Sequence, residues 1–293
     1  MATVFEVVVA GSDEAYARQA ATAAFAEIDR LEQDLSRYID SSDVARINTL
    51  RAGQSTQVGL DTLECIEIAV QVHSRTAGAF DVTIGPLLAC WRTKDGEPRT
   101  PSKSELDAAR ARVGMQWLEL DRENLTVRVL KDGMQVDLGG VGKGYALDKA
   151  AQVLAEWSFE SALIDGGEST ALGIGAPPGQ DGWPVTVGGS GYRAGPGFTV
   201  RLNSRAVSGS GVERKGHHIF DPRTGRPVTD KLAAWALAPT GALADALSTA
   251  FMVMSPRNIE EYCRRYADTS AMILVDREPE PGLQRIGRWP GQT

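Results

Sequence analysis

The chain has 293 residues, of which 42% are hydrophobic and 24% are charged, a composition that supports a globular protein with a sizeable core. The formal net charge is -7, and no dense Lys/Arg block could contact a polyanion, so nucleic acid is excluded as an expected partner. The three cysteines are far apart, which predicts packed thiols rather than a disulfide framework or a thiolate metal cluster.

No apolar stretch approaches 18 residues, so no transmembrane segment is predicted. The first residues read as a strand at 3–9, without a charged region followed by an apolar region. We therefore expect a cytoplasmic location, or a periplasmic one if an export signal has been trimmed.

The first half of the chain alternates capping signals with helical periodicity. Ser12 is the predicted cap of a helix whose apolar residues continue to Leu35. Asp61 and Glu64 predict the start of a second helix, which stops at Gly78 and carries His73 on its apolar stripe, so this histidine is assigned to the core. Ser102 and Glu105 repeat the capping signature for a third helix.

The second half begins with β-like runs and ends in a strand. Strands are predicted at residues 117–120, 125–130, 134–138, 184–187, 233–238 and 271–275, the last of which closes the ordered part. Helices are predicted at residues 143–157 and 243–254, and a further helix is started by Ser255 and Pro256. This mixture favours an α+β fold over a regularly alternating α/β fold.

A glycine-rich segment at residues 136–148 leads from a predicted strand into a helix. Glycines let the backbone approach a diphosphate, amides at a helix start donate to it, and Lys143 adds a positive charge. The segment is not a Walker A motif, because Asp137 and Gly144 stand where that motif needs Gly and Ser or Thr. It is either a phosphate-binding turn or a plain strand-to-helix connection.

A second segment, residues 242–250, places Asp245 and Thr249 four residues apart on a predicted helix. Their oxygens then lie on one helix face, with Cβ atoms about 5–6 Å apart. Such hard oxygen ligands suit Mg²⁺, which takes one or two carboxylates and leaves other positions to water and phosphate. The alternative is structural, with Asp245 at the helix dipole and Thr249 bonded to its own backbone.

A third segment, residues 217–227, contains two adjacent histidines at a predicted strand end. Histidine can act as a general base near neutral pH, but neighbours on a strand point to opposite faces, so only one of His217 and His218 can face a given site. A structural, hydrogen-bonded histidine is the alternative. Two further segments, residues 36–38 and 78–87, offer an aromatic beside polar groups that could face a flat heterocycle.

Together and in this order, these segments resemble the ApbE-type family of FAD:protein FMN transferases. The most specific matches are residues 137–148, Ile164-Asp165-Gly166-Gly167, residues 218–227 and residues 244–250. The resemblance implies a single flavin transferase domain over residues 1–293, of α+β class. It would have mixed or antiparallel sheets, packed helices and an FAD cleft between two lobes, whose boundary is left open.

The resemblance also implies roles for single residues. The positions expected to contact FAD are Tyr38, Ala79, Phe80, Asp81, Asp137, Lys143 and Phe220. Those expected to hold Mg²⁺ are the backbone carbonyl of Gly140, the side chains of Asp245 and Thr249, and Ser248 through its carbonyl. His218 matches the catalytic histidine of the family.

The implied activity is magnesium-dependent transfer of the FMN half of FAD to a Ser or Thr hydroxyl of another flavoprotein, with release of AMP. The chain has no match to the Asp-x-x-Ser/Thr-Gly-Ala-Thr signature of acceptors, so the acceptor is expected to be a separate protein. Two alternatives stay open, which are metal-dependent hydrolysis of FAD to FMN and AMP and non-catalytic FAD binding.

Overall fold

The computed structural model describes residues 3–11, 13–93, 95–167, 169–188, 197–212, 218–276 and 281–290. The chain divides into two compact units. Unit 1 consists of Met1–Arg30, Val141–Gly216 and Thr229–Thr293, and unit 2 of Leu31–Gly140 and His217–Val228. One boundary falls inside helix α1 (Glu14–Leu35), and another falls within the glycine-rich segment, between Gly140 and Val141.

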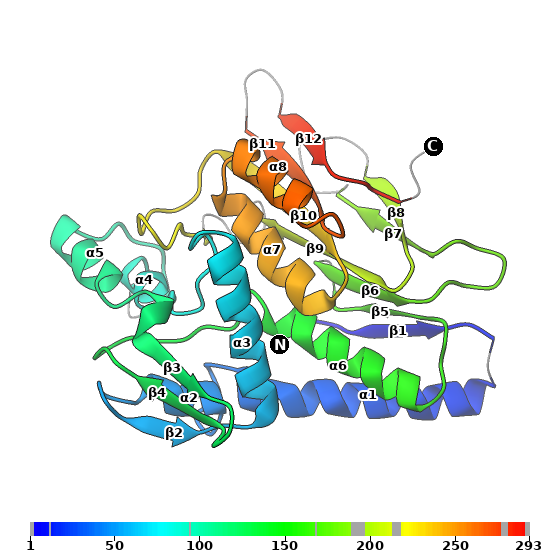
Figure 1. Ribbon diagram of the computed structural model, residues 1–293, viewed down its shortest axis with the longest axis horizontal. Helices are drawn as coiled ribbons and strands as arrows, with labels where there is room; N and C mark the ends of the chain where they lie inside the picture. Colours follow the sequence, from blue (N-terminus) through cyan, green and yellow to red (C-terminus); the bar gives the residue numbers. More distant parts are fainter. Residues whose placement is uncertain are drawn as a thin grey trace. The chain divides into compact units, whose positions relative to one another are not determined.

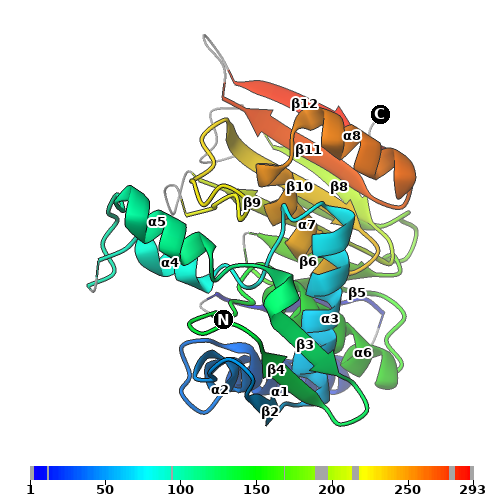
Figure 2. The same cartoon turned by 60° about the vertical axis from the view of Figure 1, so that its left-hand side comes forward.

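Unit 1 is built on one seven-stranded sheet in which every neighbouring pair is antiparallel (Figure 1). Its strands, in spatial order, are β1 (Glu6–Val9), β5 (Ala162–Asp165), β6 (Thr170–Ile174), β9 (Arg205–Gly211), β10 (Lys231–Ala238), β11 (Ser270–Val275) and β12 (Gly282–Ile286). The expectation that the strand at 271–275 closes the fold is wrong, because β12 follows and pairs with β11 at the sheet edge beside helix α8 (Pro256–Arg265; Figure 2).

Helices α6 (Gly142–Glu156) and α7 (Gly241–Val253) pack on this sheet, and small side chains allow α7 to lie close to it. Ser208 and Ser210 of β9 lie opposite Ala236 and Ala234 of β10, so one sheet face carries only small residues there. Large side chains occupy the other face, where Trp235 lies opposite Gly209 and leaves no room for a Cβ on that glycine. The small side chains on the sheet face with Ser208 and Ser210 therefore allow α7 to pack closely against β9 and β10.

The other sheet face forms a hydrophobic core of unit 1 together with the hairpin β7 (Trp183–Val187) and β8 (Phe198–Leu202). Apolar residues from the sheet and the hairpin interdigitate. They include Trp183, Val200, Leu202, Trp235, Leu237, Met272 and Leu274, and Trp289, which follows β12, packs with them. This burial fixes the register of the sheet and hence the side on which Ser208 and Ser210 emerge.

Unit 2 combines a small sheet with short helices. The sheet has the order β2 (Ser55–Gln57), β4 (Thr126–Val129) and β3 (Leu118–Asp121), all antiparallel. The helices are α2 (Asp43–Asn48), α3 (Leu60–Arg75), α4 (Gly85–Cys90), α5 (Lys103–Arg110) and the 3₁₀ turn η1 (Met115–Trp117). Together these elements confirm the α+β prediction.

Most predicted elements are confirmed, and their signals behave as expected. Ser102 and Glu105 form a complete capping box on α5, and Ser255 caps α8 with Pro256 in its first turn. The prediction for α3 is wrong in its start, since the helix begins at Leu60 with Gly59 as N-cap. The predicted cap Ser12 lies outside the described residues, and the Asp13 carboxylate accepts from the amide of Tyr16 at that helix start.

The predicted strand at 134–138 is wrong. Alternate side chains in this segment are buried as in a strand, but only Gln135 makes a β-bridge, to Ile84. The backbone of Val136 pairs with a side chain instead, because Asn48 donates to its carbonyl and accepts from its amide.

The cysteines are free thiols, with Cys65 and Cys263 buried. No helix in the described ranges is long and apolar enough to cross a membrane.

Candidate functional site

The first turn of α6 leaves backbone donors available. Its N-cap residue, Val141, provides no side-chain cap, and the amides of Gly142 and Lys143 make no hydrogen bond to any described residue. The start of α7 differs, because Thr240 accepts from Leu243 there and two further amides are capped from α6. The start of α6, unlike that of α7, is thus a helix terminus in the described part of unit 1 that can still bind an anion.

Gly144 and Asp148 hold α6 against α7. A Cβ on Gly144 would lie 2.0 Å from the carbonyl oxygen of Gly241, so only glycine permits this approach. One turn later, the Asp148 carboxylate accepts from the amides of Gly241 and Ala242 at 2.6 and 2.8 Å. Burial raises the pKa of Asp148 to about 6, with a smaller contribution from the charge of Asp245.

Asp245 reaches back from α7 to the start of α6. Its Oδ2 accepts from the Gly144 amide at 3.0 Å, and its Oδ1 lies 3.2 Å from Lys143 Nζ and 3.2 Å from Ser208 Oγ. Lys143 Nζ also donates to the hydroxyl of Thr170, which lies 2.7 Å from Ser208 Oγ. Lys143 and Asp245, predicted as separate FAD and metal contacts, are therefore paired within one buried polar cluster.

Thr249 and Ser248 lie one turn further along α7 and contact the next serine of β9. Ser210 Oγ is 2.8 Å from Ser248 Oγ and 3.2 Å from Thr249 Oγ1. One helical turn advances about 5.4 Å and two strand residues advance about 6.6 Å, so successive turns of α7 meet alternate residues of β9. Ser208 therefore lies beside Asp245, and Ser210 lies beside Ser248 and Thr249. Asp245 and Thr249 thus share the β9-facing side of α7, although their hydroxyl partners differ.

These groups fit a magnesium ion by their chemistry. They offer one carboxylate and several hydroxyl oxygens, which are hard ligands, and Mg²⁺ characteristically takes one or two carboxylates and fills its other positions with water and phosphate. No group of three or more His, Cys, Asp or Glu side chains that could hold a metal occurs in the described part of the chain. The predicted carbonyl ligand, Gly140, belongs to unit 2 and is the last residue before the boundary.

In unit 2, Asp137 is held by two contacts. Arg37 Nη1 donates to its Oδ2 at 2.9 Å, and the amide of Gly139 donates to its Oδ1 at 2.8 Å. Next to Arg37, the Tyr38 side chain is 85% exposed, and the Arg37 guanidinium lies 5.6 Å from its ring centroid. This exposed ring is free to cover a ligand, which keeps its predicted role open.

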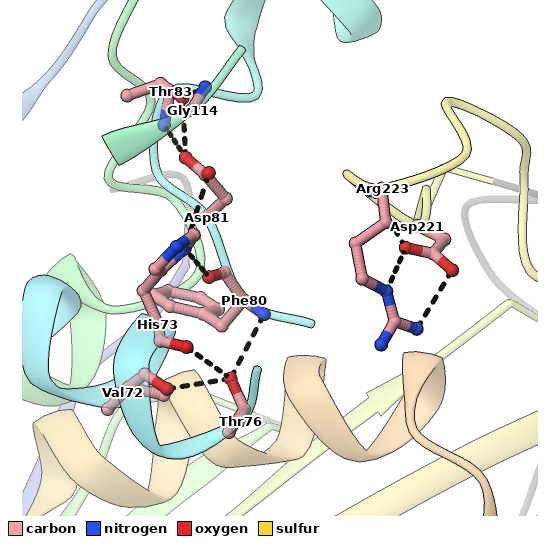
Figure 3. A network of polar contacts seen from close by, with 9 residues as sticks. All are labelled: Val72, His73, Thr76, Phe80, Asp81, Thr83, Gly114, Asp221 and Arg223. Carbon is pink, nitrogen blue, oxygen red and sulfur yellow. Dashed lines mark hydrogen bonds and ion pairs between the residues drawn. The ribbon is translucent and has the colours of Figure 1, made fainter. Parts of the chain in front are cut away.

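The predicted FAD-contacting turn of unit 2 is buried, and its Asp81 is bound to polar groups of Thr83 (Figure 3). Ala79 and Phe80 are buried, and the Asp81 carboxylate accepts from the amide and hydroxyl of Thr83 at 2.8 and 2.5 Å. Burial raises the pKa of Asp81, and these hydrogen bonds partly oppose that effect. Ala79 and Phe80 can therefore contact a ligand chiefly through their backbone.

His73 is not the core residue that the apolar stripe predicts. Its side chain is 28% exposed, and its Nδ1 lies 2.9 Å from the Phe80 carbonyl and 3.4 Å from Asp81 Oδ2 (Figure 3). Because a carbonyl only accepts, this contact requires Nδ1 to carry a proton and to donate it to Phe80. His73 lines a cavity of about 450 Å³ in unit 2, opposite Arg223, and a Cβ on Gly78 would touch both side chains.

His218 and Phe220 belong to a turn rather than to a strand. Only Phe220 makes an isolated bridge, to Pro227, so strand alternation does not orient His218, and His217 lies outside the described residues. The turn is tied by Asp221, which accepts from Arg223 Nε and Nη2 at 2.8 and 3.0 Å. The Phe220 ring is buried 5.5 Å from that of Trp91.

Several polar residues of these sites were not found by sequence reasoning. Thr170, Ser208, Ser210 and His73 have no motif of their own, and the first three reach the site only through sheet pairing with distant segments. Asp148 did carry a signal, since it closes the predicted 136–148 segment at helical spacing from Gly144. The 136–148 segment therefore determines how α6 packs against α7, in addition to offering a possible phosphate site.

Comparisons with known proteins identify the family of the chain. The ApbE family model matches residues 1–274. The FAD:protein FMN transferase of Salmonella typhimurium (strain LT2) is 30% identical over 294 residues, covering 95% of this chain and 83% of that protein. The FAD:protein FMN transferase of Klebsiella pneumoniae (strain 342) is 29% identical over 296 residues, with the same coverage of 95% and 83%.

Solved structures show the same fold. The apo flavinyl transferase ApbE of Pseudomonas stutzeri superposes with a TM-score of 0.85 at 26% identity, covering 96% of this chain and 90% of that one. The ApbE protein of Thermotoga maritima gives a TM-score of 0.83 at 30% identity, covering 97% and 94%. The predictions of fold class and of a transferase enzyme are confirmed, and the chain belongs to the ApbE family.

Proposed function

We propose that this chain transfers the FMN moiety of FAD to a Ser or Thr hydroxyl of another protein, in a magnesium-dependent reaction that releases AMP. The observation that carries the proposal is the start of α6, where two amides without a described partner adjoin Lys143 and the buried carboxylate of Asp245. Donors for a diphosphate and an oxygen ligand for its cation meet there. Family membership supports the same substrate.

The proposed role of unit 1 is to bind and orient the diphosphate. The amides of Gly142 and Lys143 donate to phosphate oxygens, and the Lys143 ammonium adds charge. Asp245, Ser248 and Thr249 would hold Mg²⁺, with the carbonyl of Gly140 as a further ligand. Bound there, the ion would neutralise charge that develops on the phosphate oxygens.

The proposed role of unit 2 is to hold the flavin and move a proton. Tyr38 covers the ring, Phe220 and the 79–81 turn contact FAD, and Asp137 adds a polar contact. The acceptor oxygen attacks the FMN-side phosphorus and gives its proton to His218. The new P–O bond forms as the bond between that phosphorus and the bridging oxygen breaks, and AMP leaves.

The test is to incubate the purified chain with FAD, Mg²⁺ and a separate protein that carries a candidate Ser/Thr acceptor motif. We expect the mass of the acceptor to rise by that of one FMN less one water, with release of AMP in equal amount. Asp245→Asn keeps the side-chain volume, removes the charged ligand and should lose most activity at any Mg²⁺ concentration, whereas the exposed control Asp107→Asn should not. FMN and AMP without acceptor labelling would show FAD hydrolysis, and retained intact FAD would show a carrier.

A further inference from the structure

Lys143 and Asp245 form an ion pair that is largely shielded from water. Their side chains are 16% and 8% exposed, and Nζ lies 3.2 Å from Oδ1. The pair sits among hydroxyls, since Lys143 also donates to Thr170 and Asp245 accepts from Ser208. An ion pair in these surroundings is weakly screened by solvent.

Only one neighbour of Asp245 in these contacts supplies a charge. The Gly144 amide and the Ser208 hydroxyl are neutral donors, whereas Lys143 is a cation. A buried carboxylate without a countercharge is costly, so the Lys143 ammonium balances Asp245 in the ligand-free protein. The same carboxylate is the charged ligand assigned to Mg²⁺ in the proposed function.

We propose that Lys143 occupies the cation position beside Asp245 in the ligand-free protein and leaves it for the diphosphate when a divalent cation binds. The proposal rests on the proposed function only for the assignment of that cation to Asp245. Two cations on one carboxylate oxygen repel each other, so the ammonium and the metal compete. The flexible four-carbon stem of lysine allows the ammonium to change partners.

The consequence is that the ligand-free protein binds a divalent cation weakly. A diphosphate supplies the ammonium with a new anionic partner and frees Asp245, so metal and dinucleotide strengthen each other's binding. Lys143 is then a positioning residue that favours the metal–dinucleotide pair over the free metal. This coupling adds to any direct contact between metal and phosphate. Its cause, the competition of Lys143 and the metal for Asp245, can be measured without FAD.

The experiment measures Mg²⁺ affinity by calorimetry on the ligand-free protein, with no FAD or acceptor present. Removing the competitor in Lys143→Met should tighten Mg²⁺ binding about tenfold, within the about 5–150-fold range usual for coupled sites. Lys143→Arg keeps the charge and should stay close to the wild type. Lys149→Met, on the same helix, controls for a general loss of positive charge. Unchanged affinity in Lys143→Met, or an equal gain in Lys149→Met, would overturn the proposal.

Two further measurements secure the interpretation. Lys143→Met leaves Asp245 without its countercharge, so the thermal midpoint of the variant in EDTA should be lower than that of the wild type. Mg²⁺ should restore this midpoint, and it should also restore folding if the variant is unfolded without metal. A variant that Mg²⁺ does not restore contradicts the proposal, as does tight Mg²⁺ binding that survives in Lys143→Met/Asp245→Asn. Wild-type FMN transfer at saturating Mg²⁺, assayed separately, tests the proposed function alone.

Discussion

Asp148 offers the sharpest test of how the helix pair in unit 1 is held. Its carboxylate accepts from the amides of Gly241 and Ala242, and burial raises its pKa from 3.8 to about 6. We consider Asp148→Asn, which keeps the size of the side chain and one acceptor oxygen but cannot ionise. The variant should change the pH dependence of stability more than the stability at neutral pH.

The sign follows from proton linkage. Because its pKa is higher in the folded protein than in the unfolded chain, Asp148 contributes most stability below about pH 4, and this contribution is lost as the pH rises through about 6. The difference between 3.8 and about 6 corresponds to about 3 kcal/mol. About 2 kcal/mol of it falls between about pH 4.5 and 7.5.

At neutral pH two effects of Asp148→Asn oppose each other. The variant loses a charge-assisted hydrogen bond to one of the two amides, worth about 1.5–3 kcal/mol. It also removes the cost of burying an ionised carboxylate, which is of similar size. The net change in the free energy of unfolding should therefore be small at pH 7 and destabilising by about 2 kcal/mol near pH 4.5.

The assay is urea unfolding followed by tryptophan fluorescence at several pH values between about 4.5 and 7.5. The quantity of interest is the difference in unfolding free energy between wild type and variant at each pH, since Asp81 and Asp165, whose pKa values burial also raises, contribute equally to both proteins. Asp107→Asn, an exposed position on α5, is the matched control. Parallel pH profiles for Asp148→Asn and wild type would refute the reasoning.

Three further predictions, at the α6–α7 contact, the histidine pair and Tyr38, have defined outcomes. Gly144→Ala should lower the unfolding free energy by about 1–3 kcal/mol or more, and lower the thermal midpoint with it, because its Cβ would lie 2.0 Å from the Gly241 carbonyl oxygen. A midpoint equal to that of the wild type would contradict this packing. His218→Ala should slow FMN transfer about 10²–10⁴-fold with FAD affinity nearly kept, whereas His217→Ala should be mild; equal losses, or a loss of affinity alone, would argue against a general base. Tyr38→Asn should weaken FAD retention and raise hydrolysis relative to transfer, and an unchanged product ratio would place the ring away from the flavin.

Local sequence signals predicted helices well because a helix satisfies its own backbone. The periodicity up to Leu35 and the caps at Ser102 and Ser255 operate within a few residues, and the structure has the corresponding elements. The 134–138 segment shows the limit of such signals. Its alternating burial is strand-like, but the partner of Val136 is the side chain of Asn48, 88 residues away, and no local pattern contains that information.

In the candidate site too, local spacing was predictable from the sequence and long-range contacts were not. The spacing of Asp245 and Thr249 correctly placed both on one side of α7, since helical geometry alone determines it. Their partners Ser208 and Ser210 arise from the pairing of β9 with β10 and from the packing of α7, which the sequence does not encode locally. His73 was misassigned because an apolar helical stripe cannot show that the chain returns at Phe80 and offers a carbonyl to the ring.

The glycine-rich segment therefore has two physical functions that substitution can separate. Gly144 and Asp148 set the distance and angle between α6 and α7, so their loss should act through the position of the whole α7 helix. Lys143 contacts the polar groups Thr170 and Asp245, and it adjoins two amides, of Gly142 and of Lys143 itself, that have no partner among the described residues. If the segment served packing alone, well-packed apolar residues in place of the buried pair Lys143 and Asp245 would serve as well or better. The presence of Lys143 beside Asp245 is what favours a phosphate-binding site over a plain strand-to-helix connection.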